Sequence, residues 1–355
     1  MNEPIKIIKD KVRALSAYSL TPYRAPIKLN QNESPWDAPA QIRNETLRRL
    51  QEKPWSRYPD FHAVALHHTL AEFTGWKADG IIAGNGSNEF IQALLMVTVG
   101  AETPVLISEP TFALYRQIAT VLGGNVISVP LSADLTYDGD VLRTTIESAA
   151  PQVTIICSPN NPTGCLIDPA ELEILLAASQ GLIVIDEAYH EFSGQTVVPL
   201  LNKYSNLIVL RTFSKAMAMA GLRIGYLLAA PEMAQEITKA VLPYNLNIVS
   251  QTAAQVAIEM YESALQPQVK QICAERDRVY HALSEIAGLE PAPSRANFFV
   301  VRSAINPRWV FDELLRHGIL IRDVSRYPML ADYFRVSVGT PEENDKLIAA
   351  LREIF

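Results

Sequence analysis

The sequence predicts an α/β fold: a mainly parallel central sheet covered by helices, with an arm before it and a smaller α+β domain after it. Three observations support this. Short apolar strands alternate with helical patterns from about residue 65 to 230, a long helical stretch follows from about residue 245, and the N-terminus combines a short helical pattern with an irregular segment. We therefore expect an arm over residues 1–35, a large domain over 36–244 and a small domain over 245–355.

Runs rich in Val, Ile and Leu define the expected strands of the large domain, because strands buried on both faces are continuously apolar: residues 81–84, 105–108, 153–158, 182–186, 207–210 and 225–229. Helical spacing of apolar residues marks the stretches 87–99, 114–121 and 169–179. Parallel strands joined through helices have their carboxyl ends at one edge of the sheet, where ligands bind. Polar residues that follow these strands are therefore candidates for a functional site.

The last third of the chain predicts a different arrangement. A long helical region is expected to about residue 287, and the elements expected after it are a strand at 298–302, a helix at 307–317, strands at 319–322 and 334–338, and a closing helix at 341–354. Helices and strands grouped in this way favour a small α+β domain.

Composition excludes several classes of protein. The 355 residues carry 31 basic and 38 acidic side chains, and the net charge of −7 argues against nucleic acid or a membrane surface as a partner. The three cysteines fit neither a disulfide framework nor a zinc site, and the six histidines show no metal spacing, so no metal is expected. No apolar run approaches the roughly 18 residues of a membrane span and no signal peptide is recognisable, so we expect a cytoplasmic protein.

One lysine stands in a distinctive setting just past the apolar run 207–210. Thr212 and Ser214 precede Lys215 by three residues and one residue, and Arg223 follows eight residues later. Burial disfavours the ammonium form of a lysine, and a neutral amine can attack an aldehyde to form a Schiff base. The hydroxyls and the guanidinium can grip a phosphate. A reactive lysine beside a phosphate cradle is what pyridoxal phosphate (PLP) requires, although an exposed lysine with a helix-capping serine is an alternative.

A second phosphate-binding element is expected where a strand leads into a helix, at Gly-Asn-Gly-Ser-Asn-Glu over residues 84–89. The backbone amides at a helix start favour an anion, and Ser87 adds a hydroxyl. A serine N-cap without a ligand is the alternative. The string is not a dinucleotide fingerprint, because glycine is missing at its last position.

Three further strand ends carry polar or aromatic residues. Pro-Asn-Asn-Pro-Thr-Gly at residues 159–164 is, by itself, also a turn sequence. Asp186 follows four apolar residues, and a carboxylate buried there needs a cationic partner such as the pyridine nitrogen of PLP. Phe112, shortly after the strand 105–108, can stack on the pyridine ring. Taken alone, the aspartate is also typical of a loop cap and the phenylalanine of a plain core.

Together with Arg57-Tyr58-Pro59, these strings occur in order over nearly the whole chain, which resembles the fold-type I, class II aminotransferases. The resemblance implies PLP as cofactor and a catalytic set in which Lys215 is the Schiff-base lysine and proton shuttle, Asp186 pairs with the pyridine nitrogen and Tyr189 bonds the ring oxygen. Its further implied cofactor contacts are Asn161 at the ring oxygen, Phe112 at the ring face, and Ser87, Asn88, Thr212, Ser214 and Arg223 at the phosphate. Tyr58 is expected to reach the cofactor phosphate of a neighbouring subunit, which implies a homodimer.

Within that family, Thr21-Pro22-Tyr23, the string 29–33 and Arg322-Asp323 resemble the histidinol-phosphate aminotransferase branch. The resemblance implies that substrate is bound by Tyr23, Asn161, Arg322 and Arg335, and paired guanidinium groups suit either a phosphate monoester or the carboxylate of glutamate. The implied reaction is a ping-pong exchange in histidine biosynthesis. L-histidinol phosphate and 2-oxoglutarate are interconverted with imidazole-acetol phosphate and L-glutamate.

Alternatives remain open. A broad aromatic aminotransferase would place an aromatic oxo acid where the phosphate ester is expected, and decarboxylation of threonine phosphate is another option of the same fold. A PLP-binding regulator would carry a DNA-binding domain, whereas only about 30 residues precede the first core motif. A nicotinamide dehydrogenase would leave Lys215 without a role.

Overall fold

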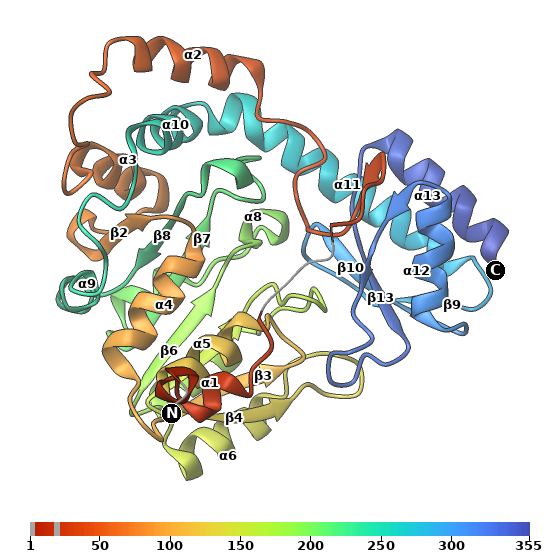
Figure 1. The fold of residues 1–355 in the computed structure, drawn as a ribbon, viewed down its shortest axis with the longest axis horizontal. Coiled ribbons are helices and arrows are strands. Elements are labelled where there is room, and N and C mark those ends of the chain that lie inside the picture. Colours follow the sequence, from red (N-terminus) through yellow and green to blue (C-terminus); the bar gives the residue numbers. More distant parts are fainter. Residues whose placement is uncertain (1–3, 18–21) are drawn as a thin grey trace.

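A seven-stranded sheet forms the centre of the computed structural model, which describes residues 4–17 and 22–355 (Figure 1). In spatial order its strands are β2 (Ile81–Gly84), β8 (Gly225–Leu228), β7 (Leu207–Thr212), β6 (Leu182–Asp186), β5 (Val153–Cys157), β3 (Pro104–Glu109) and β4 (Asn125–Pro130). Neighbouring strands are parallel except where β8 pairs with β2 and β7. The prediction of a mainly parallel sheet is therefore confirmed.

Apolar cores cover both faces of this sheet. Along β6, Ile183 and Ile185 belong to one core cluster, whereas Val184 belongs to the cluster on the opposite face. The elements that pack around the sheet are α2 (Ala40–Gln51), α3 (Val64–Thr74), η2 (Ala78–Gly80), α4 (Ser87–Thr98), α5 (Leu114–Leu122), α6 (Gly139–Ala149), α7 (Pro169–Ala178), α8 (His190–Ser193), η3 (Val198–Asn202), η4 (Ala220–Leu222), α9 (Pro231–Thr238) and α10 (Ile248–Glu259). Burial on both faces explains why the strand sequences are continuously apolar.

A second, four-stranded antiparallel sheet lies beside the first, on the right of Figure 1. Its strands, in spatial order, are β12 (Arg322–Asp323), β13 (Tyr333–Ser337), β10 (Phe298–Ser303) and β9 (Leu289–Pro291), and its helices are α11 (Gln266–Ser284), α12 (Pro307–Arg316) and α13 (Pro341–Ile354). The arm contains η1 (Pro4–Ile7), α1 (Asp10–Arg13) and β1 (Ile27–Lys28). β1 pairs in parallel with β11 (Ile319–Leu320), so this part of the arm is attached to the smaller unit, whereas α1 packs against α5 of the large unit.

The expected long helix after residue 245 is interrupted. A single π-helical turn, η5 (Tyr261–Leu265), separates α10 from α11, and Pro267 stands in the first turn of α11. Proline lacks an N–H and cannot continue a regular helix, so the chain restarts there. The expected strand 319–322 is likewise divided into β11 and β12, which join different sheets. The domain boundaries at residues 35 and 244 stay predictions.

One strand of the large sheet, β4, was not expected. β4 is the edge strand, and among its residues only Val129 is fully buried. An edge strand that is mostly accessible does not need a continuous apolar run, so its sequence signal is weak.

Two glycines allow the turn before α4 to lie against β8. Gly84 and Gly225 are register partners at the end of the β2–β8 pair. A Cβ atom on Gly225 would lie 2.5 Å from the Gly86 carbonyl carbon and 2.5 Å from the Ser87 nitrogen, both of which are backbone atoms. The start of α4 therefore keeps its position only while residue 225 has no side chain.

We expect Gly225→Ala to lower the free energy of unfolding by about 1–3 kcal/mol, because the turn before α4 must move away from β8. The midpoint of urea unfolding measures the change. Gly221→Ala is the matched control, since a Cβ there meets no atom within 4 Å. Equal midpoints for the two variants would contradict the close packing described for Gly225.

Candidate active site

A cavity of about 460 Å³ opens at the carboxyl ends of the parallel strands. The predicted site residues that line it are Ser87, Asn88, Phe112, Asn161, Asp186, Tyr189, Thr212, Ser214, Lys215, Arg223, Arg322 and Arg335. Asp186 ends β6 and Thr212 ends β7, whereas Arg322 and Arg335 come from the smaller sheet. The cavity thus lies between the two sheets, and the arm closes one wall with residues 30–33.

Lys215 presents a reactive amine to this cavity. Its Nζ donates a hydrogen bond to the backbone oxygen of Gln31 at 2.8 Å. Burial lowers the pKa of Lys215 to about 7, and the nearby positive charge of Arg335 acts in the same direction. A substantial fraction of the amine is therefore neutral near physiological pH, the form that acts as a nucleophile or a base.

Asp186 is a buried carboxylate at the floor of the cavity, with 3% of its surface exposed. Its Oδ2 accepts a hydrogen bond from the Tyr115 hydroxyl at 2.6 Å, and its Oδ1 accepts one from the Ala188 N–H at 3.1 Å. Burial raises the pKa of Asp186 to about 6, and the hydrogen bond from Tyr115 opposes that rise. A cation beside this carboxylate would compensate its desolvation.

Anion-binding groups gather where α4 begins. Gly86, with a φ of 82°, is the N-cap residue, and no side chain caps the helix. Ser87 is thus the first helical residue, and the alternative of a serine N-cap is wrong. Arg223 lies beside this helix start, since a Cβ atom on Gly86 would be 2.8 Å from its Nη2. Arg223 Nη1 donates to Ser214 Oγ at 3.1 Å, and the Thr212 and Ser214 hydroxyls are 2.9 Å apart. Uncapped amides, hydroxyls and a guanidinium are donors that suit a phosphate.

The opposite wall carries Arg335 and the amide of Asn161. Arg335 Nη1 donates to Asn161 Oδ1 at 2.6 Å, and Nη2 donates to the Asn30 backbone oxygen at 2.7 Å. Arg322 is the register partner of Arg335 across β12 and β13, so both side chains lie on one face of the sheet. The hydroxyl of Tyr189 accepts a hydrogen bond from Asn32 at 3.1 Å.

Two predicted site residues, Tyr23 and Tyr58, are not among the residues that line the cavity. The hydroxyl of Tyr23 accepts a hydrogen bond from Arg308 on α12 at 3.3 Å. Tyr58 is 79% exposed, and its ring stacks on Tyr244 with ring centroids 4.4 Å apart. Thr21, the first residue of the string quoted with Tyr23, lies outside the described residues.

Sequence reasoning missed Tyr115 and gave no role to the arm residues Asn30, Gln31 and Asn32. Tyr115 follows Phe112 by one helical turn, which was a possible signal that both face the same cavity. The arm string was noticed only as a family resemblance. Asn30 and Gln31 contribute backbone oxygens, which have no side-chain signature in a sequence, whereas Asn32 contributes its side-chain amide.

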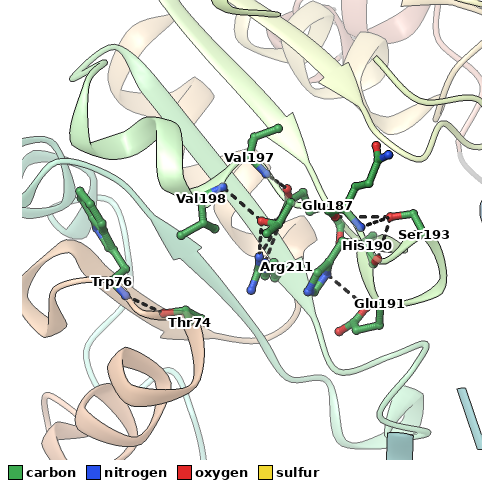
Figure 2. Close-up of polar contacts among 12 residues, drawn as sticks. Thr74, Trp76, Glu187, His190, Glu191, Ser193, Val197, Val198 and Arg211 are labelled. Carbon is green, nitrogen blue, oxygen red and sulfur yellow. Dashed lines mark hydrogen bonds and ion pairs between the residues drawn. The ribbon is translucent and has the colours of Figure 1, made fainter. Parts of the chain in front are cut away.

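A buried ion pair supports the strand ends that carry the site. Glu187 follows Asp186 and Arg211 precedes Thr212, and Arg211 Nη2 lies 2.8 Å from Glu187 Oε2 with both side chains almost inaccessible (Figure 2). The Val197 N–H donates to the other carboxylate oxygen of Glu187 at 2.6 Å. Figure 2 also shows His190 beside Glu191, and burial holds the pKa of His190 well below its usual range. The pair ties the end of β6 to the end of β7.

Within residues 4–17 and 22–355, no group of three or more His, Cys, Asp or Glu side chains is arranged to hold a metal ion. Over the same part of the chain, none of the helices combines the length and apolar character needed to cross a membrane.

Comparison with known proteins gives extensive matches. The family model of aminotransferase class I and II matches residues 24–351. A histidinol-phosphate aminotransferase of Chlorobaculum parvum is 40% identical over 329 residues, which cover 92% of this chain and 92% of the relative. Histidinol-phosphate aminotransferase 1 of Carboxydothermus hydrogenoformans is 39% identical over 355 residues, covering 100% of both chains.

Solved structures give the same result. The crystal structure of histidinol-phosphate aminotransferase from Sinorhizobium meliloti, in complex with pyridoxal-5′-phosphate, superimposes with a TM-score of 0.88. It is 26% identical in sequence, and the match covers 97% of this chain and 96% of that chain. The likeness therefore extends over both sheets.

We expect Glu187→Gln to lower the free energy of unfolding by about 3 kcal/mol or more, because the Arg211 charge stays buried without its carboxylate partner. Urea unfolding measures this. Glu236→Gln is the matched control: Glu236 pairs with Lys239 on the surface, with side chains 62% and 65% exposed, and screened pairs of this kind contribute little. A Glu187→Gln midpoint as high as that of the control would show that the buried pair does not hold the strand ends together.

Proposed function

The chain belongs to the aminotransferases of class I and II, and from this premise we propose that it interconverts L-histidinol phosphate and 2-oxoglutarate with imidazole-acetol phosphate and L-glutamate. It has the fold-type I architecture predicted from its sequence, and it is a PLP-dependent transaminase of the kind that serves histidine biosynthesis. One observation carries the substrate assignment. A single cavity presents two separate sets of anion-binding groups, one at the start of α4 and one on β12 and β13.

The residues present fit PLP. A buried carboxylate with one protein donor on each oxygen suits a protonated ring nitrogen, a largely neutral amine suits an aldehyde, and an uncapped helix start suits a phosphate. When bound, PLP supplies a ring that accepts the electron pair left at the substrate Cα. We assign the aldehyde to Lys215 and the nitrogen to Asp186; the other contacts are Asn161 and Tyr189 at the ring oxygen, Phe112 at the ring face, and Ser87, Asn88, Thr212, Ser214 and Arg223 at the phosphate.

Lys215 acts as the base in this proposal. Its Nζ takes the proton from the substrate Cα and delivers it to the C4′ atom of the cofactor. A base works best when its pKa lies near the working pH, and burial brings the pKa of Lys215 to about 7. Tyr189 lies beside this amine, since Nζ is 5.9 Å from the centroid of the tyrosine ring.

Arg335 and Arg322 orient the substrate. Two guanidinium groups on one face of the small sheet suit the phosphate of histidinol phosphate, and the same groups suit the distal carboxylate of glutamate. Because both substrates use the same anion site, they cannot be bound together. The amino group would be retained by the cofactor between the two half-reactions, which gives a ping-pong mechanism. Asn161 is hydrogen-bonded to Arg335, so a group that orients the cofactor also holds a substrate-binding arginine. Tyr23 completes this set in our proposal.

We further infer a homodimer in which Tyr58 contributes to the cofactor phosphate site of the other subunit. Tyr58 is 79% exposed, and Trp55, Phe61 and Leu242 are exposed as well. Large exposed hydrophobic side chains are typical of a surface that contacts another subunit. A cytoplasmic location and a division into an arm, a large domain (36–244) and a small domain (245–355) belong to the same proposal. The three cysteines are free, as in a reducing compartment.

One observation favours a second candidate, a broad aromatic aminotransferase of the same fold. Tyr23 contacts Arg308 and Phe311 and does not line the cavity, whereas Tyr327 and Val324 border it close to Arg322. An aromatic oxo acid could then occupy the space that we give to the phosphate ester. In the first candidate Arg322 binds the substrate phosphate, whereas in the second it only borders an aromatic pocket.

We expect Lys215→Ala to abolish transamination while PLP still binds non-covalently, because the variant keeps the carboxylate and the phosphate site but loses the base. Turnover of L-histidinol phosphate and 2-oxoglutarate measures activity, and equilibrium dialysis measures bound PLP. Near-normal turnover in this variant would refute the assignment of Lys215.

We expect Arg322→Gln to raise the KM for L-histidinol phosphate by roughly 10- to 100-fold, as for the loss of a charge-assisted hydrogen bond, and to change the KM for L-phenylalanine little. Steady-state kinetics with each amino donor measures both. Arg326→Gln, at an exposed position in the segment that follows β12, is the control. A wild type that prefers L-phenylalanine would support the aromatic aminotransferase instead.

A further inference from the structure

Tyr115 carries a buried hydroxyl that the proposed reaction does not use. It lies in the first turn of α5, its surface is completely buried, and its Oη is 2.6 Å from Asp186 Oδ2. Tyr115 also lines the cavity, so this hydrogen bond lies at the wall of the site. A phenylalanine would fill the same space, so packing alone does not explain the hydroxyl.

The hydrogen bonds of Asp186 come from two different parts of the chain. Tyr115 on α5 donates to Oδ2, and the Ala188 N–H, beyond the end of β6, donates to Oδ1. A carboxylate can accept about four hydrogen bonds, so these two leave room for a cationic donor. The terminal torsion of an aspartate has a broad energy profile, so one donor on each oxygen fixes the plane of the carboxylate.

The same segment also positions an aromatic ring. Phe112 precedes Tyr115 by three residues, and the two rings meet edge to face with centroids 5.5 Å apart. Phe112 is the residue that we expect against the cofactor ring. The segment 112–115 therefore places a stacking group and a donor to Asp186 around one position in the cavity.

We propose that Tyr115 is a positioning residue that acts through Asp186: its hydrogen bond keeps the carboxylate ionised and directed at the pyridine nitrogen of the cofactor. The inference rests on the proposed function, because it presupposes PLP. It assigns to α5 a part in positioning the cofactor, in addition to the stacking that we expect of Phe112 just before this helix.

Electrostatics supports this role. Burial raises the pKa of Asp186, and the hydrogen bond from Tyr115 is the largest effect that opposes it. The other titratable groups around Asp186 are Cys157 of β5, Tyr137 before α6, and Glu187 and Tyr189 beside it in the chain. Burial raises the pKa of Cys157, Tyr137 and Tyr189, which keeps them uncharged, and Glu187 is paired with Arg211. None of these groups replaces the donor that Tyr115 supplies.

Loss of the Tyr115 hydroxyl should move the acid limit of PLP binding to a higher pH. Without the hydroxyl, the pKa of Asp186 rises above about 6, so the carboxylate becomes protonated at a higher pH. A neutral carboxyl no longer attracts a protonated pyridine nitrogen. The pH below which cofactor binding weakens should therefore move upward.

The experiment measures PLP affinity of cofactor-free protein by equilibrium dialysis from about pH 5 to pH 9. For Tyr115→Phe we expect an affinity about tenfold lower at neutral pH, and an acid fall-off about one pH unit higher than in the wild type. Tyr137→Phe is the matched control, because its buried hydroxyl donates to the Cys157 backbone oxygen at 2.5 Å and not to Asp186. It should leave the pH profile unchanged.

A second experiment, in Asp186→Asn protein, distinguishes a positioning role of the Tyr115 hydroxyl from a packing role of its ring. In Asp186→Asn protein, adding Tyr115→Phe should cost almost no further affinity, because the group through which Tyr115 acts is already neutral. An unshifted pH profile in Tyr115→Phe, or a further tenfold loss in the Asp186→Asn background, would overturn the inference. A wild type that does not bind PLP would refute the proposed function as well, so the two failures are distinguishable.

Discussion

The buried ion pair between Glu187 and Arg211 is the constraint on which the site depends. Charges in a core cost desolvation energy, and such pairs often add little net stability compared with apolar residues. What this pair does is geometric. It joins the residue after Asp186 to the residue before Thr212, so the carboxylate of Asp186 and the hydroxyl of Thr212 are held on adjacent strand ends in one register. An apolar pair would pack there without that directional link.

Burial has opposite effects on the two central ionisable groups. It lowers the pKa of Lys215 to about 7 and raises that of Asp186 to about 6, because desolvation disfavours whichever form carries charge. Burial in one cavity therefore brings the pKa of an amine down and the pKa of a carboxyl group up, both to values near neutral pH. Two protein donors, the hydroxyl of Tyr115 and the N–H of Ala188, oppose the effect of burial on Asp186 and keep its carboxylate ionised near neutral pH.

The sequence was informative where chemistry is concentrated in short strings at strand ends. Lys215, Asp186 and the start of α4 could be predicted because a buried apolar run fixes where the next polar residue emerges. Contacts between distant segments could not. Tyr115 and Asp186 are 71 residues apart. The spacing of Phe112 and Tyr115 indicates a shared face, but no local pattern shows that this face meets Asp186. Tyr23 illustrates the opposite case: its string was recognisable, but the direction of its ring depends on α12, where Arg308 and Phe311 meet it. The division of strand 319–322 between two sheets likewise depends on tertiary pairing.

The register of the small sheet has a thermodynamic consequence. Arg322 stands directly opposite Arg335, and like charges at facing positions of antiparallel strands repel each other. Arg335 donates to the side-chain oxygen of Asn161 and to the backbone oxygen of Asn30, and these hydrogen bonds orient its guanidinium. An anion that binds both guanidinium groups would relieve this repulsion, so ligand binding and resistance to unfolding are linked quantities.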